Sequence, residues 1–161
     1  GQKCSAASRA YIPRSIWKTI KDDLISQING IKMGPCEDFS CFMNAVIDKP
    51  AYDRIKGHIA LTKIASDAKI LAGGGCDETQ GYFIRPTLIE TTNPQYKTMT
   101  EEIFGPVMTV FVYEDDKFSE TLRICDTTSP YALTGAVFAR DRDAIKEASD
   151  VLADAAAVGR A

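Results

Sequence analysis

The stretch that most constrains the fold is an apolar run at residues 107–113, which comes directly after a Gly105-Pro106 pair. Glycine and proline interrupt regular structure, and a short apolar run bounded by such a pair is typical of a buried strand. Glu102 and Phe104 precede the pair. The sequence therefore predicts that these two side chains lie on a connecting loop at one edge of a sheet.

Strand-like and helix-like segments alternate along the second half of the chain, from Lys69 onward. This alternation is typical of an α/β fold, in which helices cover the faces of the sheet. We therefore expect a largely parallel sheet flanked by helices. The expected strands cover residues 8–13, 69–72, 81–90, 107–113 and 133–139, with Pro86 at an edge or a bulge.

Small polar residues mark the expected helix starts, because their side chains can accept hydrogen bonds from the free N–H groups of a first turn. These residues are Ser15, Asp48, the Asp115-Asp116 pair and Asp141. Each is followed by apolar residues at helical spacing. The faces expected to be buried are Ile16, Trp17, Ile20, Leu24 and Ile28; Tyr52, Ile55 and Ile59; Phe118, Leu122 and Cys125; and Ile145, Ala148, Val151, Leu152 and Ala155.

Composition narrows the range of partners. The chain has 161 residues, 45% of them hydrophobic, which is enough for one domain with a buried core. Its net charge is −3. The charge balance gives no indication of a nucleic-acid partner, and no apolar run reaches the roughly 18 residues of a membrane span. The five cysteines form no tight pairs and no cluster with histidine. We interpret them as free thiols and expect no metal site.

Several conspicuous residues fit structural roles. His58 is the single histidine, and we expect it to be partly exposed on the second helix. Asp53, Arg54 and Lys56 are expected on the solvated face of the same helix. The Gly-Gly-Gly run at residues 73–75 lacks the spacing of a phosphate-binding loop.

The candidate chemical residues are ambiguous when each is considered alone. Cys4 has a positive neighbour, Lys3, and small residues around it, which favour a reactive thiolate with room for a substrate. An isolated cysteine is nevertheless more often an inert apolar residue. Glu102 on a loop also fits a solvated charge, as its neighbour Glu101 does, and Phe104 fits a core aromatic as well as a ligand contact.

Two motifs resolve this ambiguity, because they resemble the NAD(P)-dependent aldehyde dehydrogenases. Residues 101–107, Glu-Glu-Ile-Phe-Gly-Pro-Val, match the most recognisable internal motif of that family. Residues 1–6, Gly-Gln-Lys-Cys-Ser-Ala, match the sequence around its nucleophilic cysteine. Further short matches are spread along nearly the whole chain, at residues 37–39, 45–48, 70–74, 81–83, 112–113 and 133–138.

The resemblance implies a role for each candidate residue. Cys4 would attack the aldehyde carbon, and the resulting thiohemiacetal would lose hydride to NAD and become a thioester that water hydrolyses. Glu102 would bind the nicotinamide-side ribose hydroxyls, since a carboxylate offers two acceptor oxygens. Phe104 would pack near the nicotinamide and help to exclude water.

Ser5 and its surroundings resemble one branch of the family, which acts on 1-pyrroline-5-carboxylate in proline degradation. The resemblance implies that the small-molecule substrate is glutamate 5-semialdehyde, the opened form of that compound, and that Ser5 contacts it. The product would be L-glutamate. A dehydrogenase for another semialdehyde is an alternative.

The resemblance covers only part of a family chain. It implies that residues 1–161 are a partial catalytic domain, and that the NAD-binding Rossmann domain and a C-terminal segment for substrate binding and oligomerisation are absent. We therefore expect the isolated chain to be inactive. The full-length protein would be a homo-oligomer of the mitochondrial matrix, although this chain has no targeting segment. A short, non-catalytic interaction or structural module on the same scaffold is the second alternative.

Overall fold

The computed structural model describes residues 1–130 and 133–153. Its main feature is a four-stranded sheet with the order β1-β6-β5-β2. The first three of these strands run parallel, and β2 is antiparallel to β5, so the expected α/β fold with a largely parallel sheet is confirmed. The strands are β1 (Arg9–Pro13), β2 (Ala68–Ala72), β5 (Thr87–Thr91) and β6 (Val107–Tyr113), and a separate short hairpin joins β3 (Cys76–Asp77) to β4 (Phe83–Ile84).

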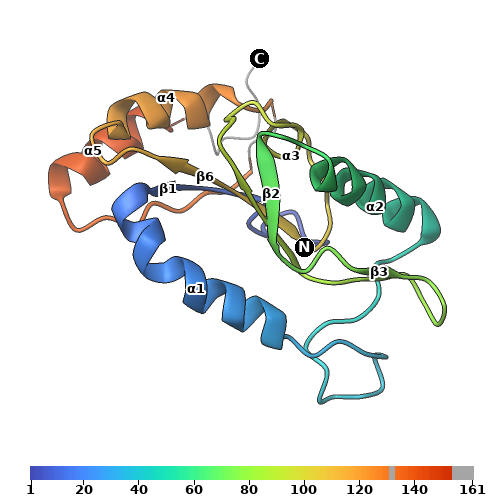
Figure 1. The fold of residues 1–161 in the computed structure, drawn as a ribbon. Helices are drawn as coiled ribbons and strands as arrows, with labels where there is room; N and C mark the ends of the chain where they lie inside the picture. Colours follow the sequence, from blue (N-terminus) through green and yellow to red (C-terminus); the bar gives the residue numbers. More distant parts are fainter. Residues whose placement is uncertain (131–132, 154–161) are drawn as a thin grey trace.

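Helices α1 (Arg14–Gly30) and α2 (Lys49–Lys63) lie on opposite faces of the sheet (Figure 1). Successive residues of a strand point to opposite faces. Leu88 of β5 therefore packs with Trp17 of α1, whereas its neighbour Ile89 packs with Ile55 of α2. The described residues form three further helices: α3 (Lys97–Thr100), α4 (Phe118–Thr127) and α5 (Arg142–Val151).

Two of the expected helix caps are confirmed. The carboxylate of Asp48 accepts a hydrogen bond from the Ala51 N–H at 2.8 Å, and that of Asp141 accepts one from the Asp143 N–H at 2.8 Å. These bonds satisfy N–H groups that have no partner within their own helix.

The caps predicted at Ser15 and Asp115 are wrong, because Ser15 does not cap α1 and Asp115 does not cap α4. Helix α1 begins at Arg14, and the Ser15 N–H donates to the Asp115 carboxylate at 3.2 Å. Asp115 thus caps α1, which is far away in the sequence, and α4 begins without a side-chain cap at Lys117. Asp115 can reach α1 because β1 and β6 pair in parallel, which brings the residues after both strands to the same edge of the sheet.

Two strand predictions also need correction. The strand expected at residues 81–90 is interrupted at Arg85-Pro86, and its two halves pair with different neighbours. The stretch at residues 133–139 forms no strand. Its apolar pattern is strand-like, but it has no pairing partner in the part of the chain that the structure describes, and the side chain of Phe138 is 96% exposed.

The helix faces are less uniformly buried than their patterns predict. Tyr52, Ile55 and Ile59 of α2 are fully buried, as expected. On α1 and α5, however, some of the expected core residues are exposed, because no other element among residues 1–130 and 133–153 covers them: Ile16, Ile20 and Ile145. Ala155 lies outside the described residues. Within the described ranges, no helix has the length and apolar character needed to cross a membrane.

Candidate active site

The two motif segments lie at the same edge of the sheet, before the parallel strands β1 and β6. In the β1–β6 register Arg9 is opposite Thr109, and Cys4 and Phe104 precede these two residues by the same number of positions. The segments are also in direct contact, because a Cβ placed on Gly1 would lie 1.8 Å from the carbonyl oxygen of Gly105. Only glycine permits such an approach between two backbones.

Cys4 and Ser5 lie at the tip of a turn that the Ala6 N–H closes by donating to the Lys3 carbonyl at 3.0 Å. Both side chains are exposed. The turn is fixed on its other side by Gln2, whose side-chain oxygen accepts a hydrogen bond from the Ile47 N–H at 2.8 Å. The structure therefore presents the Cys4 thiol on an anchored turn that is open to an incoming molecule.

The loop at residues 101–105 alternates between anchored and exposed positions. Ile103 is buried, whereas Glu102 is exposed and Phe104 is 36% exposed. Phe104 has a φ of 52°, in the left-handed region that costs a non-glycine residue about 1 to 2 kcal/mol. Such backbone strain persists only where surrounding contacts enforce it, and it is concentrated at functional sites.

Glu102 has the properties expected of a ligand carboxylate. Its side chain makes no hydrogen bond or ion pair with any of residues 1–130 or 133–153. Glu101 next to it is instead paired with Lys97 at 3.7 Å, and its carboxylate lies 3.7 Å from the His58 imidazole. Both oxygens of Glu102 are therefore free to accept hydrogen bonds from a pair of hydroxyl groups, so the residues fit a cofactor ribose.

His58 is buried, with 8% of its surface exposed, so the prediction of a partly exposed histidine is wrong. It follows Ile55 by one helical turn and therefore shares the face of α2 that packs against the sheet. Burial lowers the pKa of the imidazole, and the nearby Glu101 carboxylate opposes this effect in part.

The other cysteines differ from Cys4 in their surroundings. Burial raises the pKa of the thiols of Cys76 and Cys125, which disfavours the reactive thiolate. Cys36 is exposed, as Cys4 is, but it lies in the loop after α1. Cys4 is thus the exposed thiol that shares an edge of the sheet with Glu102.

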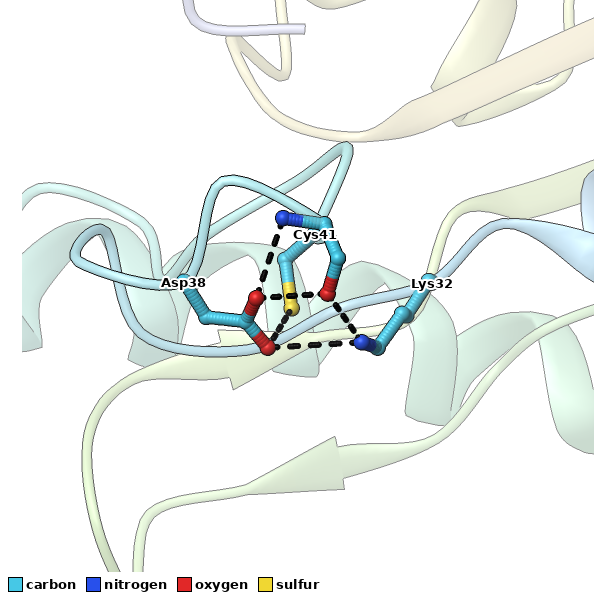
Figure 2. Close-up of polar contacts among 4 residues, drawn as sticks. Lys32, Asp38 and Cys41 are labelled. Carbon is cyan, nitrogen blue, oxygen red and sulfur yellow. Dashed lines mark hydrogen bonds and ion pairs between the residues drawn. The ribbon is translucent and has the colours of Figure 1, made fainter.

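Cys41 belongs to a hydrogen-bonded network that shapes the loop after α1 (Figure 2). Its thiol donates to the Asp38 carboxylate at 3.3 Å, and Lys32 approaches the same carboxylate at 3.3 Å. Hydrogen bonds from Ser40, Cys41 and Lys32 lower the pKa of Asp38 to about 2. Burial and the Asp38 carboxylate raise the pKa of Cys41, so this thiol is a protonated donor rather than a nucleophile.

An open cavity of about 380 Å³ lies elsewhere, between residues 33–35 and the β3–β4 hairpin. Arg85 and Phe83 form part of its wall, and none of the candidate site residues lines it. Within the described residues, no group of three or more His, Cys, Asp or Glu side chains is arranged to hold a metal ion.

The sequence identifies the two segments but not the contacts that α2 makes with the second of them. Arg54 is exposed on α2, as expected, and its guanidinium also donates to the carbonyl of Ile103 at 3.4 Å. No local pattern signals this contact, because it depends on how α2 packs against the 101–105 loop.

Comparisons with known proteins identify one family over nearly the whole chain. The sequence profile described as "Aldehyde dehydrogenase family" matches residues 1–159. The mitochondrial delta-1-pyrroline-5-carboxylate dehydrogenase of Dictyostelium discoideum is 54% identical over 97% of this chain and 28% of its own length. Its human counterpart is 50% identical, with the same coverage of 97% and 28%. The chain thus spans 28% of the length of these relatives.

Solved structures show the same fold. The delta-pyrroline-5-carboxylate dehydrogenase of Mycobacterium tuberculosis bound with NAD superimposes with a TM-score of 0.88 at 39% identity, over 96% of this chain and 28% of that one. A betaine aldehyde dehydrogenase from Staphylococcus aureus in complex with NAD+ gives a TM-score of 0.82 at 30% identity, over 93% of this chain and 30% of that one.

Proposed function

Because the chain belongs to the aldehyde dehydrogenase family, we propose that it is the nucleophile-bearing part of an NAD-dependent enzyme that oxidises L-glutamate 5-semialdehyde to L-glutamate. This aldehyde is the opened form of 1-pyrroline-5-carboxylate, so the reaction belongs to proline degradation. The observation that carries the proposal is the 54% identity over 97% of the chain to a protein named for that substrate.

Cys4 is the proposed nucleophile. Its thiolate forms a C–S bond to the aldehyde carbon, and the carbonyl electrons move onto oxygen. The backbone N–H of Cys4 makes no hydrogen bond within the described residues and is available to this oxyanion. Loss of hydride from the carbon gives a thioester, and attack by water then releases the carboxylic acid and restores the thiol.

Glu102 and Phe104 are the proposed cofactor residues. Glu102 accepts hydrogen bonds from the ribose hydroxyls through its two unpaired carboxylate oxygens. Phe104 would pack near the nicotinamide with its partly exposed side chain and help to exclude water. When it is bound, NAD supplies the acceptor for the hydride.

Ser5 is the proposed substrate contact. Its exposed hydroxyl follows Cys4 on the same turn and can donate a hydrogen bond to the carboxylate end of the semialdehyde. A hydrogen bond of this kind favours a substrate that carries a negative charge over a neutral aldehyde.

Residues 1–161 are proposed to be one part of the catalytic domain, with nucleotide binding supplied by another part of a longer polypeptide. The 28% coverage of the relatives supports this division. Mitochondrial location and assembly into a homo-oligomer are proposed for the whole protein. The names of several relatives carry the word mitochondrial and support the first of these. Imaging of the tagged full-length protein and its mass in solution test the two points.

A chimera tests the proposed activity. This chain replaces the matching segment of the Dictyostelium discoideum relative, and NADH formation is followed with 1-pyrroline-5-carboxylate as substrate. We expect the chimera to be active. Cys4→Ala should lower kcat by about a thousandfold or more, as loss of a covalent nucleophile does elsewhere.

Cys36→Ala is the matched control, because Cys36 is also exposed but lies in another loop. It should retain the activity of the unmodified chimera. An inactive chimera that is nevertheless folded, or a fully active Cys4→Ala variant, would contradict the proposal. Faster oxidation of a different semialdehyde would overturn the substrate assignment alone.

A further inference from the structure

One face of α2 contacts the residues on both sides of Glu102, namely the Glu101 side chain and the backbone at Ile103 and Gly105. Arg54 and His58 are four residues apart and therefore project from the same side of the helix, with Ile55 beside them. Arg54 reaches Ile103, His58 reaches Glu101, and Ile55 lies against Gly105. The proposed cofactor carboxylate lies between these contact points and is itself unpaired.

The contact from Arg54 is directional. Its Nη2 donates to the Ile103 carbonyl oxygen at 3.4 Å. Arginine stays charged at every accessible pH, and a hydrogen bond from a charged donor is stronger than one between neutral groups. Ile103 is 3% exposed, so its side chain anchors the same residue in the core while the guanidinium fixes its carbonyl.

Ile55 packs against the same loop two residues further on, at Gly105. A Cβ on Gly105 would lie 2.4 Å from the Ile55 Cδ1, so the loop backbone rests directly on this buried side chain. His58 lies 3.7 Å from the Glu101 carboxylate, and Lys97 of α3 holds the same carboxylate from its exposed side. Phe104, with its left-handed backbone, lies between Ile103 and Gly105, which both contact α2.

We propose that Arg54 is a positioning residue for cofactor binding, which fixes the Ile103 peptide so that the Glu102 carboxylate is held in place for the ribose hydroxyls. This inference rests on the proposed role of Glu102. A loop that is already ordered loses less conformational entropy when a ligand binds, so the contact increases cofactor affinity without touching the cofactor. Arg54 takes no part in the chemistry at Cys4.

The test uses the full-length chimera and its steady-state kinetics. Arg54→Met keeps the aliphatic stem and removes the donor. We expect the KM for NAD to rise about two- to tenfold, the range of one net hydrogen bond, with kcat and the KM for the aldehyde unchanged. Arg54→Lys keeps a positive donor and should restore part of the loss.

Lys56→Met is the matched control, since it makes the same kind of change two residues further along α2, at a side chain that pairs with Glu78 at 3.8 Å rather than with the loop. Its KM for NAD should equal that of the unmodified chimera. A purely structural role of Arg54 would instead lower the amount of active enzyme, and hence kcat, with the KM for NAD unchanged. That result would overturn the inference.

Glu102→Gln distinguishes the proposed cofactor role of Glu102 from the positioning role of Arg54. If it raises the KM for NAD and Arg54→Met does not, the cofactor site stands and the positioning role fails. If neither variant changes the KM for NAD in an active chimera, the proposed role of Glu102 fails and the inference fails with it.

Discussion

Ser5 and Cys4 share one exposed turn but have different expected functions, and single substitutions can separate them. In the chimera, Ser5→Ala should raise the KM for glutamate 5-semialdehyde about ten- to a hundredfold, because one hydrogen bond to a charged group, about 1.5 to 3 kcal/mol, is lost. The kinetic constants for a neutral aldehyde such as propanal should not change. Steady-state kinetics with each of the two aldehydes measure this difference in KM directly.

Ser8→Ala is the control for that experiment, since the Ser8 side chain is exposed and only its carbonyl is used, as the acceptor for the Thr109 N–H at 3.0 Å. Equal losses with both aldehydes in Ser5→Ala would show that the residue shapes the turn rather than recognises the substrate.

The predictability of the site differs from residue to residue. Cys4, Ser5, Glu102 and Phe104 belong to contiguous motifs, and a motif is visible in the sequence. Arg54 has no such signal. It is one of several charged residues on α2, and only the packing of the helix against the 101–105 loop distinguishes it from its neighbours.

At the scale of secondary-structure elements, Glu90 joins β5 to both α1 and β2. Burial alone would raise its pKa, but hydrogen bonds from Lys69, Lys21 and Trp17 lower it to about 2, compared with an ordinary value of 4.5. Lys69 approaches at 2.8 Å and Lys21 at 2.9 Å. The carboxylate thus accepts hydrogen bonds from two elements that flank its strand.

This shift makes stability depend on pH in a defined direction. Because the folded-state pKa of Glu90 is lower than the unfolded one, its contribution is present above about pH 4.5 and is lost as the pH falls toward 2. We expect Glu90→Gln to lower the free energy of unfolding at pH 7 by about 1 to 2 kcal/mol, after allowance for solvent screening. Urea unfolding at pH 7 and at low pH measures this difference, which should shrink on acidification.

Glu114→Gln is the comparison for that series, because Glu114 pairs with Arg14 on the surface, where an ion pair contributes little. If the two variants lose the same free energy at pH 7, the Glu90 network does not stabilise the junction of these elements.

Local patterns predicted most of the elements but failed where long-range contacts decide the outcome. The run at residues 107–113 became β6 with the expected bounds, and Asp48 and Asp141 cap the helices that follow them. The segment at residues 133–139 has an equally strand-like pattern. It forms no strand because strands depend on a neighbour, and sequence periodicity does not reveal whether a neighbour is present.

At the scale of the whole molecule, the isolated chain should not turn over. A single charged hydrogen bond from Glu102 contributes about 1.5 to 3 kcal/mol, whereas micromolar affinity for NAD needs roughly 8 kcal/mol. We expect no steady formation of NADH when the purified 161-residue chain is mixed with NAD and 1-pyrroline-5-carboxylate. Absorbance at the NADH band, with the chimera as the positive control, checks this.

Sustained NADH production by the chain alone would contradict that expectation. It would mean that residues 1–161 bind the cofactor with contacts beyond Glu102 and Phe104. The proposed division of labour between this segment and the rest of a longer polypeptide would then be wrong.

The cap that Asp115 provides for α1 has a consequence for how the molecule is made. The free N–H of Ser15 finds its acceptor only after the chain has been synthesised as far as Asp115 and β6 has paired with β1. Contacts this distant in sequence slow folding, because a long loop must close before they form. On the ribosome, α1 emerges before β6, and its first turn is completed only when β6 and the loop after it have left the exit tunnel.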